Sequence, residues 1–349
     1  MRKVQDQRLF DLIRGFLTDY LPHRRNASPH TIRAYSQAIR QLLEHVATSN
    51  GKSIAEVTFA DIDSEAVSRF LDHLERCRNC STATRNHRLK CIRAFYSYAA
   101  EDEPSVVACK GELGKVPFKR AAAEPALKYA SESDIALILN APDAKTAKGR
   151  RDRMLMSFLY DTGARVQEVL NVRVSDVQTN GTPTVMLIGK GRKARPVPMM
   201  RNTVGMLKRY LAEFHPSDGE SSSEPLFYTT RNGERRRMTE DNVRKMVAAY
   251  GAAVAKQRPG FPERIHPHLF RHSRAMHLYQ NGMDLSLVSQ WLGHAQIETT
   301  LIYAHADTEM KRRAIEQATP ESSPMRKHII PQRMKIDDDK MILTLYGMR

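Results

Sequence analysis

A stretch rich in proline and glycine interrupts the helical pattern of this chain between residues 103 and 129. Its helix-breaking residues are Pro104, Gly111, Gly114, Pro117 and Pro125, and it also carries a basic Phe-Lys-Arg sequence. Because proline and glycine oppose regular secondary structure, we expect an extended linker over 104–130, close to the binding partner. The chain has 349 residues, which is too long for one typical compact domain. The expected domains are therefore 6–103 and 131–320, with a tail over 321–349.

The segment before this linker has the pattern of an all-helical domain of four or five helices. Ser28 is placed to cap a helix, and Pro29 occupies its first position. Apolar residues then follow at steps of three and four, which is the spacing of one helix face. They are Ile32, Tyr35, Ile39, Leu42 and Val46. The segments 63–75 and 81–99 repeat this pattern, so further helices are expected there.

The segment after the linker combines helices with a pair of strands. Ser131 is placed to cap its first helix, and Gly163 is placed to end the second. Residues 182–199 read as two strands joined by a basic turn. Further helices are expected at about 202–214 and 239–256. The sequence therefore predicts a fold that is mainly α with a small β-sheet.

The charge of the chain favours a polyanionic partner. Lysine and arginine number 55 against 39 aspartates and glutamates, a formal net charge of +16. Such an excess usually accompanies nucleic acid binding, although a merely basic protein is the alternative. The sequence shows neither an apolar run long enough for a membrane span nor a signal peptide pattern at its start. Its four cysteines suit a reducing compartment, so we expect a cytoplasmic protein that lies on the nucleoid when bound to DNA.

Ionisable side chains are concentrated among apolar residues between residues 266 and 305. His268 and Arg271 are three positions apart on a predicted helix, so they project to the same side. Two histidines at positions i and i+4, here His268 and His272, also occur in zinc-binding helices. However, Leu269 stands where the hydrolase motif has glutamate, and an arginine between metal ligands would repel a cation. Phosphate chemistry fits better, because arginine presents a planar fork of donors to phosphate oxygens.

Five short stretches carry a resemblance to a known family. His268-x-x-Arg271, the Leu-Gly-His-Ala sequence containing His294, and the Thr-Thr-Leu-Ile-Tyr-Ala-His sequence containing Tyr303 resemble the C-terminal signature of the tyrosine recombinases, the phage integrase type. Arg165 occupies the position of that family's first catalytic arginine, and Lys190 lies on the turn that bears its lysine. The resemblance extends over residues 8–318, with departures at Gln167 and His266 that remove no catalytic group.

The resemblance implies a SAM-like helical DNA-binding domain followed by a mixed α+β catalytic domain. It also implies that six residues form one site, namely Arg165, Lys190, His268, Arg271, His294 and Tyr303. The two arginines are expected to bind the non-bridging phosphate oxygens, and His294 to add a hydrogen bond. Tyr303 is the expected nucleophile and His268 its proton acceptor, while Lys190 protonates the leaving 5′-oxygen. Glu168 is expected to orient Arg165, and His272 is expected to contact the catalytic side chains without touching the phosphate.

The implied partner is double-stranded DNA, bound by a homotetramer on paired sites. Candidate DNA contacts are Arg33, Arg40, Arg85, Arg88, Arg93, Arg192 and Lys193, each of which would otherwise be part of a solvated basic face. We expect no metal, no nucleotide cofactor and no membrane association. Cys77 and Cys80 form a weak zinc signal, and a turn at a helix end is the favoured interpretation.

Several functions share this set of residues. Integration or excision of a mobile element is favoured over resolution of chromosome or plasmid dimers. A type IB topoisomerase uses related residues, and a non-catalytic DNA-binding regulator would be expected to have lost one of them. The apolar segment 341–347 in the tail could be a strand or a docking peptide.

Overall fold

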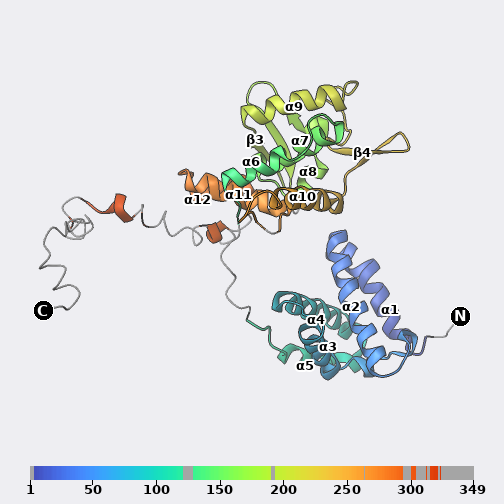
Figure 1. Ribbon diagram of the computed structural model, residues 1–349. Helices are drawn as coiled ribbons and strands as arrows, with labels where there is room; N and C mark the ends of the chain where they lie inside the picture. Colours follow the sequence, from blue (N-terminus) through green and yellow to red (C-terminus); the bar gives the residue numbers. More distant parts are fainter. Residues whose placement is uncertain are drawn as a thin grey trace, which may run out of the picture. The chain divides into compact units, whose positions relative to one another are not determined.

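The computed structural model divides into two compact units, Met1–Glu124 and Pro125–Arg349 (Figure 1). It describes residues 4–120, 129–189, 193–262, 264–293 and 300–303, together with 312, 315–320 and 323. The tail segment 341–347 therefore lies outside the described residues. Within these ranges, no helix is long and apolar enough to cross a membrane.

The N-terminal unit is helical, as the sequence predicts. Its elements are α1 (Gln7–Gly15), a π-helix (Phe16–Arg24), α2 (Pro29–Ser49), two short 3-10 helices (Ile54–Glu56 and Phe59–Ile62), α3 (Ser64–Arg76) and α4 (Thr82–Asp102). The predicted cap of α2 is confirmed, since the Ser28 hydroxyl accepts a hydrogen bond from the Thr31 amide at 3.2 Å. The apolar faces of α2, α3 and α4 meet in one core.

The segment after α4 differs from its prediction. Residues Pro104–Val106 form a 3-10 helix that continues into α5 (Val107–Lys115), so the expected extended linker is wrong over 104–115. Val106 and Leu113 are 2% and 0% exposed, and they join the core of the N-terminal unit. The apolar area that they bury outweighs the poor helix propensity of the two glycines in α5. Residues 121–128 of the predicted linker lie outside the described part.

The turn after α3 follows the favoured interpretation of the Cys77–Cys80 segment. Cys77 caps the C-terminus of α3, and its amide donates to the His73 carbonyl at 3.0 Å. Asn79 has a φ of 49°, a left-handed conformation that asparagine tolerates at helix ends. The predicted helix-end turn is confirmed.

The C-terminal unit is a mixed α+β domain. Its helices are α6 (Glu132–Asn140), α7 (Ala147–Thr162), α8 (Val166–Asn171), α9 (Arg201–Phe214), α10 (Glu240–Ala255), α11 (Pro267–Gln280) and α12 (Leu285–Leu292). A three-stranded antiparallel sheet has the order β1 (Val177–Gln178), β2 (Thr184–Ile188) and β3 (Ala194–Pro198). Val185 pairs with Val197, and both are fully buried. Helix α7 packs against α9 and α11 and lies within the core.

A second hairpin was not predicted from the sequence. Strands β4 (Tyr228–Arg231) and β5 (Glu234–Arg237) pair antiparallel and project from the helices (Figure 1). Asn232 and Gly233 connect them with φ values of 53° and 80°. Asn-Gly is the strongest short-range signal for such a two-residue turn, so this pair of residues could have revealed the hairpin.

Candidate catalytic site

Four of the predicted catalytic residues lie on described elements of the C-terminal unit. Arg165 occupies the N-cap position of α8, directly after the turn that ends α7. His268 and Arg271 lie on α11, and Tyr303 lies in the described helical residues 300–303. Lys190 and His294 lie outside the described residues.

Two glycines end the helices that lead into the site. Gly163 at the end of α7 has a φ of 58°, and Gly293 at the end of α12 has a φ of 68°. This left-handed conformation favours glycine. A Cβ on Gly163 would also lie 2.8 Å from the Trp291 ring, because the turn after α7 packs against the C-terminal end of α12. The predicted helix end at Gly163 is confirmed.

Arg271 joins the ends of these two helices. Its Nη1 donates to the Gly163 carbonyl at 2.7 Å, and its Nη2 donates to the Leu292 carbonyl at 2.9 Å. These carbonyls lie at helix C-termini, where the aligned peptide dipoles attract positive charge. Arg271 is only 4% exposed, and burial lowers the pKa of its guanidinium to about 10. It therefore remains positively charged at neutral pH.

Arg165 is more accessible than Arg271. Its side chain is 37% exposed, and its Nη1 donates to Glu168 Oε1 at 3.0 Å. The Glu168 carboxylate also accepts a 3.0 Å hydrogen bond from the Arg165 amide. Glu168 thus holds Arg165 at both its backbone and its side chain, as the prediction of an orienting role requires.

The sequence analysis missed Arg195, which binds the same carboxylate from β3. Its Nη2 lies 2.8 Å from Glu168 Oε2 and its Nη1 lies 3.2 Å from Glu168 Oε1. Its Nε donates to the Trp291 carbonyl at 3.2 Å, and a Cβ on Gly293 would lie 2.8 Å from its guanidinium carbon. Arg195 therefore ties β3 to the C-terminal end of α12.

Burial and hydrogen bonding act against each other on the Glu168 carboxyl. Burial raises its pKa, but hydrogen bonds from Arg195 and from the Arg165 amide outweigh burial and keep the pKa below its usual range. A lowered carboxyl pKa stabilises the fold above the pKa of the unfolded chain, and this contribution is lost as the pH falls through the folded value. Glu168 is therefore ionised at neutral pH and balances the two arginines.

Replacing Arg195 with methionine is expected to lower the rate of DNA cleavage by about 10-fold to 100-fold, because small displacements of positioned groups have effects of this size. DNA affinity should stay unchanged. The Glu168→Gln variant should show a similar loss, and the double variant should lose less than the product of the two. Single-turnover cleavage measures all three. Arg258→Met breaks an ion pair with Asp134 and serves as the control. Multiplicative losses would contradict action through Glu168.

Tyr303 lies inside the unit and contacts a different histidine from the predicted one. Its side chain is 0% exposed, and its hydroxyl lies 3.1 Å from His272 Nδ1. His268, the expected proton acceptor, is exposed and faces the His266 ring at a centroid distance of 6.4 Å. The structure thus brings Tyr303 to His272, which the sequence analysis assigned to a supporting position.

The predicted DNA contacts of the N-terminal unit differ in how far they are exposed. Arg33 and Arg40 are exposed, and Arg40 lies 3.5 Å from Glu44. Arg85 is 4% exposed, and its Nη1 donates to the Pro117 carbonyl at 2.7 Å. A side chain so deeply buried offers almost no surface to a DNA backbone, so the prediction for Arg85 is wrong.

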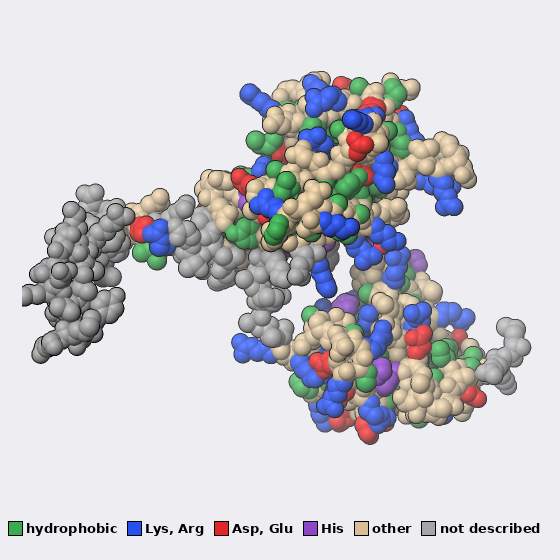
Figure 2. All heavy atoms as spheres, viewed as in Figure 1, with side chains coloured by type: hydrophobic (Ala, Val, Ile, Leu, Met, Phe, Trp, Pro, Cys, Tyr) green, Lys and Arg blue, Asp and Glu red, His purple; other side chains and the backbone are tan. Residues whose placement is uncertain are grey.

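Two further predicted contacts of the N-terminal unit, Arg88 and Arg93, lie between these extremes. Arg93 is half-buried and donates to the carbonyls of Leu113 and Gly114 at 2.8 and 3.0 Å. It therefore holds the C-terminus of α5 instead of facing solvent. Arg88 is half-buried and Lys193 is exposed, while Arg192 lies outside the described residues. Lysine and arginine side chains are spread over the visible face of both units (Figure 2).

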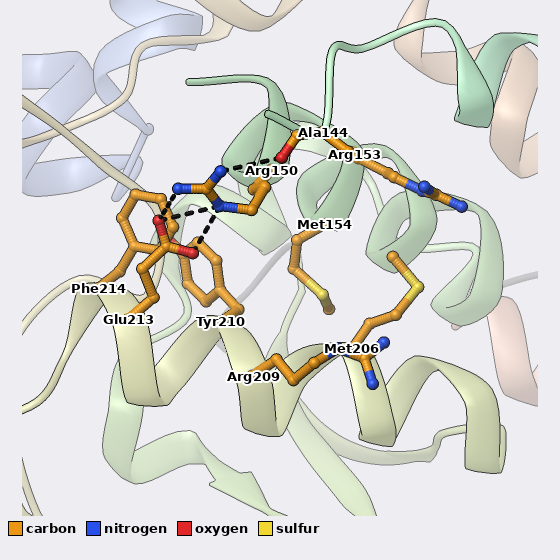
Figure 3. A pocket seen from close by; sticks show the side chains of 9 residues that line it. All are labelled: Ala144, Arg150, Arg153, Met154, Met206, Arg209, Tyr210, Glu213 and Phe214. Carbon is orange, nitrogen blue, oxygen red and sulfur yellow. Dashed lines mark hydrogen bonds and ion pairs between the residues drawn. The ribbon is translucent and has the colours of Figure 1, made fainter. Parts of the chain in front are cut away.

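A cavity of about 340 Å³ lies between α7 and α9, away from these residues (Figure 3). Met154 and Met206 line it, and Arg150 at its edge donates to Glu213. None of its lining residues belongs to the predicted site. Among the described residues, no group of histidine, cysteine, aspartate and glutamate side chains is placed to hold a metal ion.

Comparison with known proteins identifies the family. The model of the phage integrase family matches residues 128–310, and that of the phage integrase N-terminal SAM-like domain matches residues 13–103. The chain belongs to the phage integrase family. It is thus a tyrosine recombinase, with the SAM-like and catalytic domains that the resemblance implied.

Relatives in this family are similar over most of their length. A putative integrase/recombinase, y4rC of Sinorhizobium fredii, is 31% identical over 90% of this chain and 92% of its own. Tyrosine recombinase XerC of Pelobacter propionicus is 30% identical over 90% and 97%. The pre-cleavage complex of XerH recombinase with its difH substrate is 23% identical, covers 89% of both chains and has a TM-score of 0.61. The Tn1549 transposon integrase with right-end DNA is 16% identical, covers 88% of this chain and 99% of its own, and has a TM-score of 0.64.

Proposed function

We propose that this recombinase cleaves and rejoins double-stranded DNA at specific sites to integrate or excise a mobile element. The observation that supports the proposal is that Arg165 follows by two residues the Gly163 carbonyl that binds Arg271, and that Tyr303 contacts His272, the residue after Arg271. The carbonyls of Gly163 and Leu292 both bind Arg271, so the turn before Arg165 and the end of α12 meet at this guanidinium. Relatives named as integrases, and solved neighbours named as recombinases bound to DNA, support it.

In the proposed reaction, the Tyr303 oxygen attacks a phosphorus atom of one DNA strand. A bond forms between the phenol oxygen and phosphorus, and the bond to the 5′-oxygen breaks, which leaves a 3′-phosphotyrosine and a free 5′-hydroxyl. His268 accepts the proton of the phenol, and Lys190 supplies a proton to the leaving oxygen. The phosphotyrosine keeps the energy of the broken phosphodiester, so rejoining needs no nucleotide.

Positively charged side chains are proposed to stabilise the negative charge on the phosphate oxygens in the transition state. Arg165 and Arg271 bind the non-bridging oxygens, and His294 donates a further hydrogen bond. The Arg165 guanidinium is already partly exposed toward solvent. Arg271 is bound to two helix ends, which holds its position firmly but requires a local opening for phosphate contact.

Four copies of the chain are proposed to act on two paired DNA sites, because exchange of two duplexes needs four cut strands. Each copy contributes one tyrosine, and cleavage occurs in pairs. The protein is proposed to act in the cytoplasm, on the nucleoid.

A second candidate is resolution of chromosome or plasmid dimers. The observation that favours it is the similarity to several proteins named tyrosine recombinase XerC, at 27% to 30% identity. Both functions use the same strand chemistry, and they differ in where the target sites lie.

The proposal is tested with DNA selected for binding from a random duplex library. A nicked version of the selected duplex should trap a covalent protein–DNA adduct, and peptide mass spectrometry should locate the adduct on Tyr303. Plasmids with two copies of the site should then undergo deletion or inversion. Tight binding without any adduct would indicate a regulator, and relaxation of supercoils without recombination would indicate a topoisomerase. Sites at the ends of the element that encodes the protein would favour integration over dimer resolution.

DNA binding should depend steeply on salt, because each phosphate contact releases a counterion. The Arg33→Ala/Arg40→Ala double variant is expected to lower the slope of log affinity against log salt by about two. Arg85→Met should instead lower the melting temperature and leave that slope unchanged, because Arg85 is buried. Fluorescence anisotropy at several salt concentrations measures the slopes. An unchanged slope in the double variant would remove both residues from the DNA interface.

A further inference from the structure

The nucleophile proposed above is enclosed by apolar side chains. Tyr303 is 0% exposed, and its ring lies in a cluster with Ala275 and Met276 of α11 and with Val288 and Leu292 of α12. A DNA phosphate needs to approach the phenol oxygen to bonding distance. The described arrangement therefore represents a state in which Tyr303 is withheld from DNA.

The hydroxyl of Tyr303 has a defined partner in this enclosed position. It lies 3.1 Å from His272 Nδ1, and the two rings are 6.0 Å apart between centroids. Burial raises the pKa of Tyr303 to about 12 and lowers the pKa of His272 to about 4. At neutral pH the phenol thus keeps its proton and the imidazole is neutral, and in the tautomer protonated at Nε2 the phenol donates the hydrogen bond to Nδ1.

This contact does not activate the phenol. Proton transfer from Tyr303 to His272 is unfavourable in this arrangement, because burial raises the pKa of the phenol and lowers the pKa of the imidazole. The hydrogen bond satisfies a buried donor, which would otherwise destabilise the enclosed position. The contact therefore favours a protonated and inactive nucleophile.

A second imidazole lies one helical turn away on the same face of α11. His268 precedes His272 by four residues, a rise of about 6 Å along the helix axis. His268 is exposed, whereas His272 is half-buried. Movement of the Tyr303 phenol along α11 by about one helical turn would take it from His272 to the more accessible His268.

We propose that His272 is a positioning residue that holds Tyr303 in a resting position until DNA is bound. The inference rests on the proposed function, because it concerns the nucleophile of that reaction. The phenol leaves His272 when it moves toward the phosphate, and His268 then becomes its proton acceptor. The free protein is kept inactive by this hydrogen bond together with the apolar cluster around the ring.

The variant His272→Phe tests the proposal, because phenylalanine keeps an aromatic ring but removes the acceptor. A hydrogen bond of this kind changes an equilibrium by about threefold to tenfold. Adduct formation on a nicked duplex, at saturating protein and in a single turnover, should therefore become about threefold to tenfold faster. Without DNA, nitration of Tyr303 by tetranitromethane should also increase, as measured by peptide mass spectrometry. His272→Gln, which retains an acceptor, should be closer to wild type in both measurements.

A matched control lies on the same helix. The Tyr160 hydroxyl is 2.7 Å from Nδ1 of the buried His277, so His277→Phe removes a second tyrosine–histidine hydrogen bond from α11. This variant should be destabilised in a similar way but should form the adduct at the wild-type rate. Equal acceleration in both variants would show that general loosening of α11 is responsible, and it would overturn the proposal.

The outcomes separate this inference from the proposed function. If the adduct maps to Tyr303 but His272→Phe is slower than wild type or equal to it, the resting contact is overturned and the proposed function stands. If the adduct maps to another residue, the proposed function itself fails. Should His272→Phe not fold, His272→Leu replaces it with the same expected acceleration, and a wild-type or lower rate in that variant overturns the proposal equally.

Discussion

Replacing Tyr303 with phenylalanine is expected to abolish the covalent DNA adduct while DNA affinity stays within about twofold of wild type. Phenylalanine keeps the ring in the cluster between α11 and α12 and removes only the hydroxyl that lies 3.1 Å from His272. Loss of a nucleophile typically lowers an enzymatic rate by four orders of magnitude or more, so adduct formation should fall by at least about 10⁴-fold. Denaturing electrophoresis of the protein with labelled nicked duplex measures the adduct.

Tyr160→Phe provides the comparison for this variant. Tyr160 also has a hydroxyl bonded to a histidine of α11, but this hydroxyl lies on α7 and contacts His277. Tyr160→Phe should retain adduct formation, with at most a modest change in melting temperature. An adduct of normal yield in Tyr303→Phe would remove Tyr303 as the nucleophile.

Replacing Arg271 with alanine is expected to lower the cleavage rate by about 10³-fold or more, because one electrostatic donor to a transition state contributes factors of this size. The same change should destabilise the fold. It leaves the Gly163 and Leu292 carbonyls without their donor and empties a buried volume. Unpaired buried polar groups each cost about 1 to 3 kcal/mol, so the melting temperature should fall by several degrees.

Two further variants separate the catalytic part of this effect from the structural part. Arg271→Lys keeps the positive charge but lacks the planar fork that reaches two carbonyls, so it should recover little of the cleavage rate. Arg274 lies on the same helix as Arg271 and forms a 3.4 Å ion pair with Asp161 of α7. Arg274→Ala breaks this ion pair and should lower stability without a comparable loss of cleavage. A near-wild-type rate in folded Arg271→Ala would exclude Arg271 from the reaction.

Local features of the fold were predictable because they depend on neighbours in the sequence. Ser28 and Ser131 cap helices as expected, since each hydroxyl accepts from an amide three residues ahead. Gly163 and Gly293 end helices because a left-handed residue is needed there. The basic hairpin strands were also recognisable, although the turn residues 190–192 lie outside the described part.

Errors arose where burial against distant residues overrides local propensity. Two glycines and Pro104 suggested a linker, but Val106 and Leu113 bury against α4 and make the segment helical. Arg85 belongs to a basic helix face by its spacing, yet a carbonyl 32 positions later binds it inside the unit. Arg195 is one of many arginines in the sequence, and only its approach to Glu168 distinguishes it.

The sequence by itself determined which reactive groups the chain carries and which of them share a helix face. Residues 268, 271 and 272 project together because an α-helix repeats every 3.6 residues. Their order therefore predicts a cluster, but it does not choose between two histidines one turn apart. Only the tertiary structure decided that His272 receives the Tyr303 hydroxyl and that Arg195 shares Glu168 with Arg165. The reason is physical: these partners lie 27 to 31 positions apart and meet only when separate segments bury their apolar sides together.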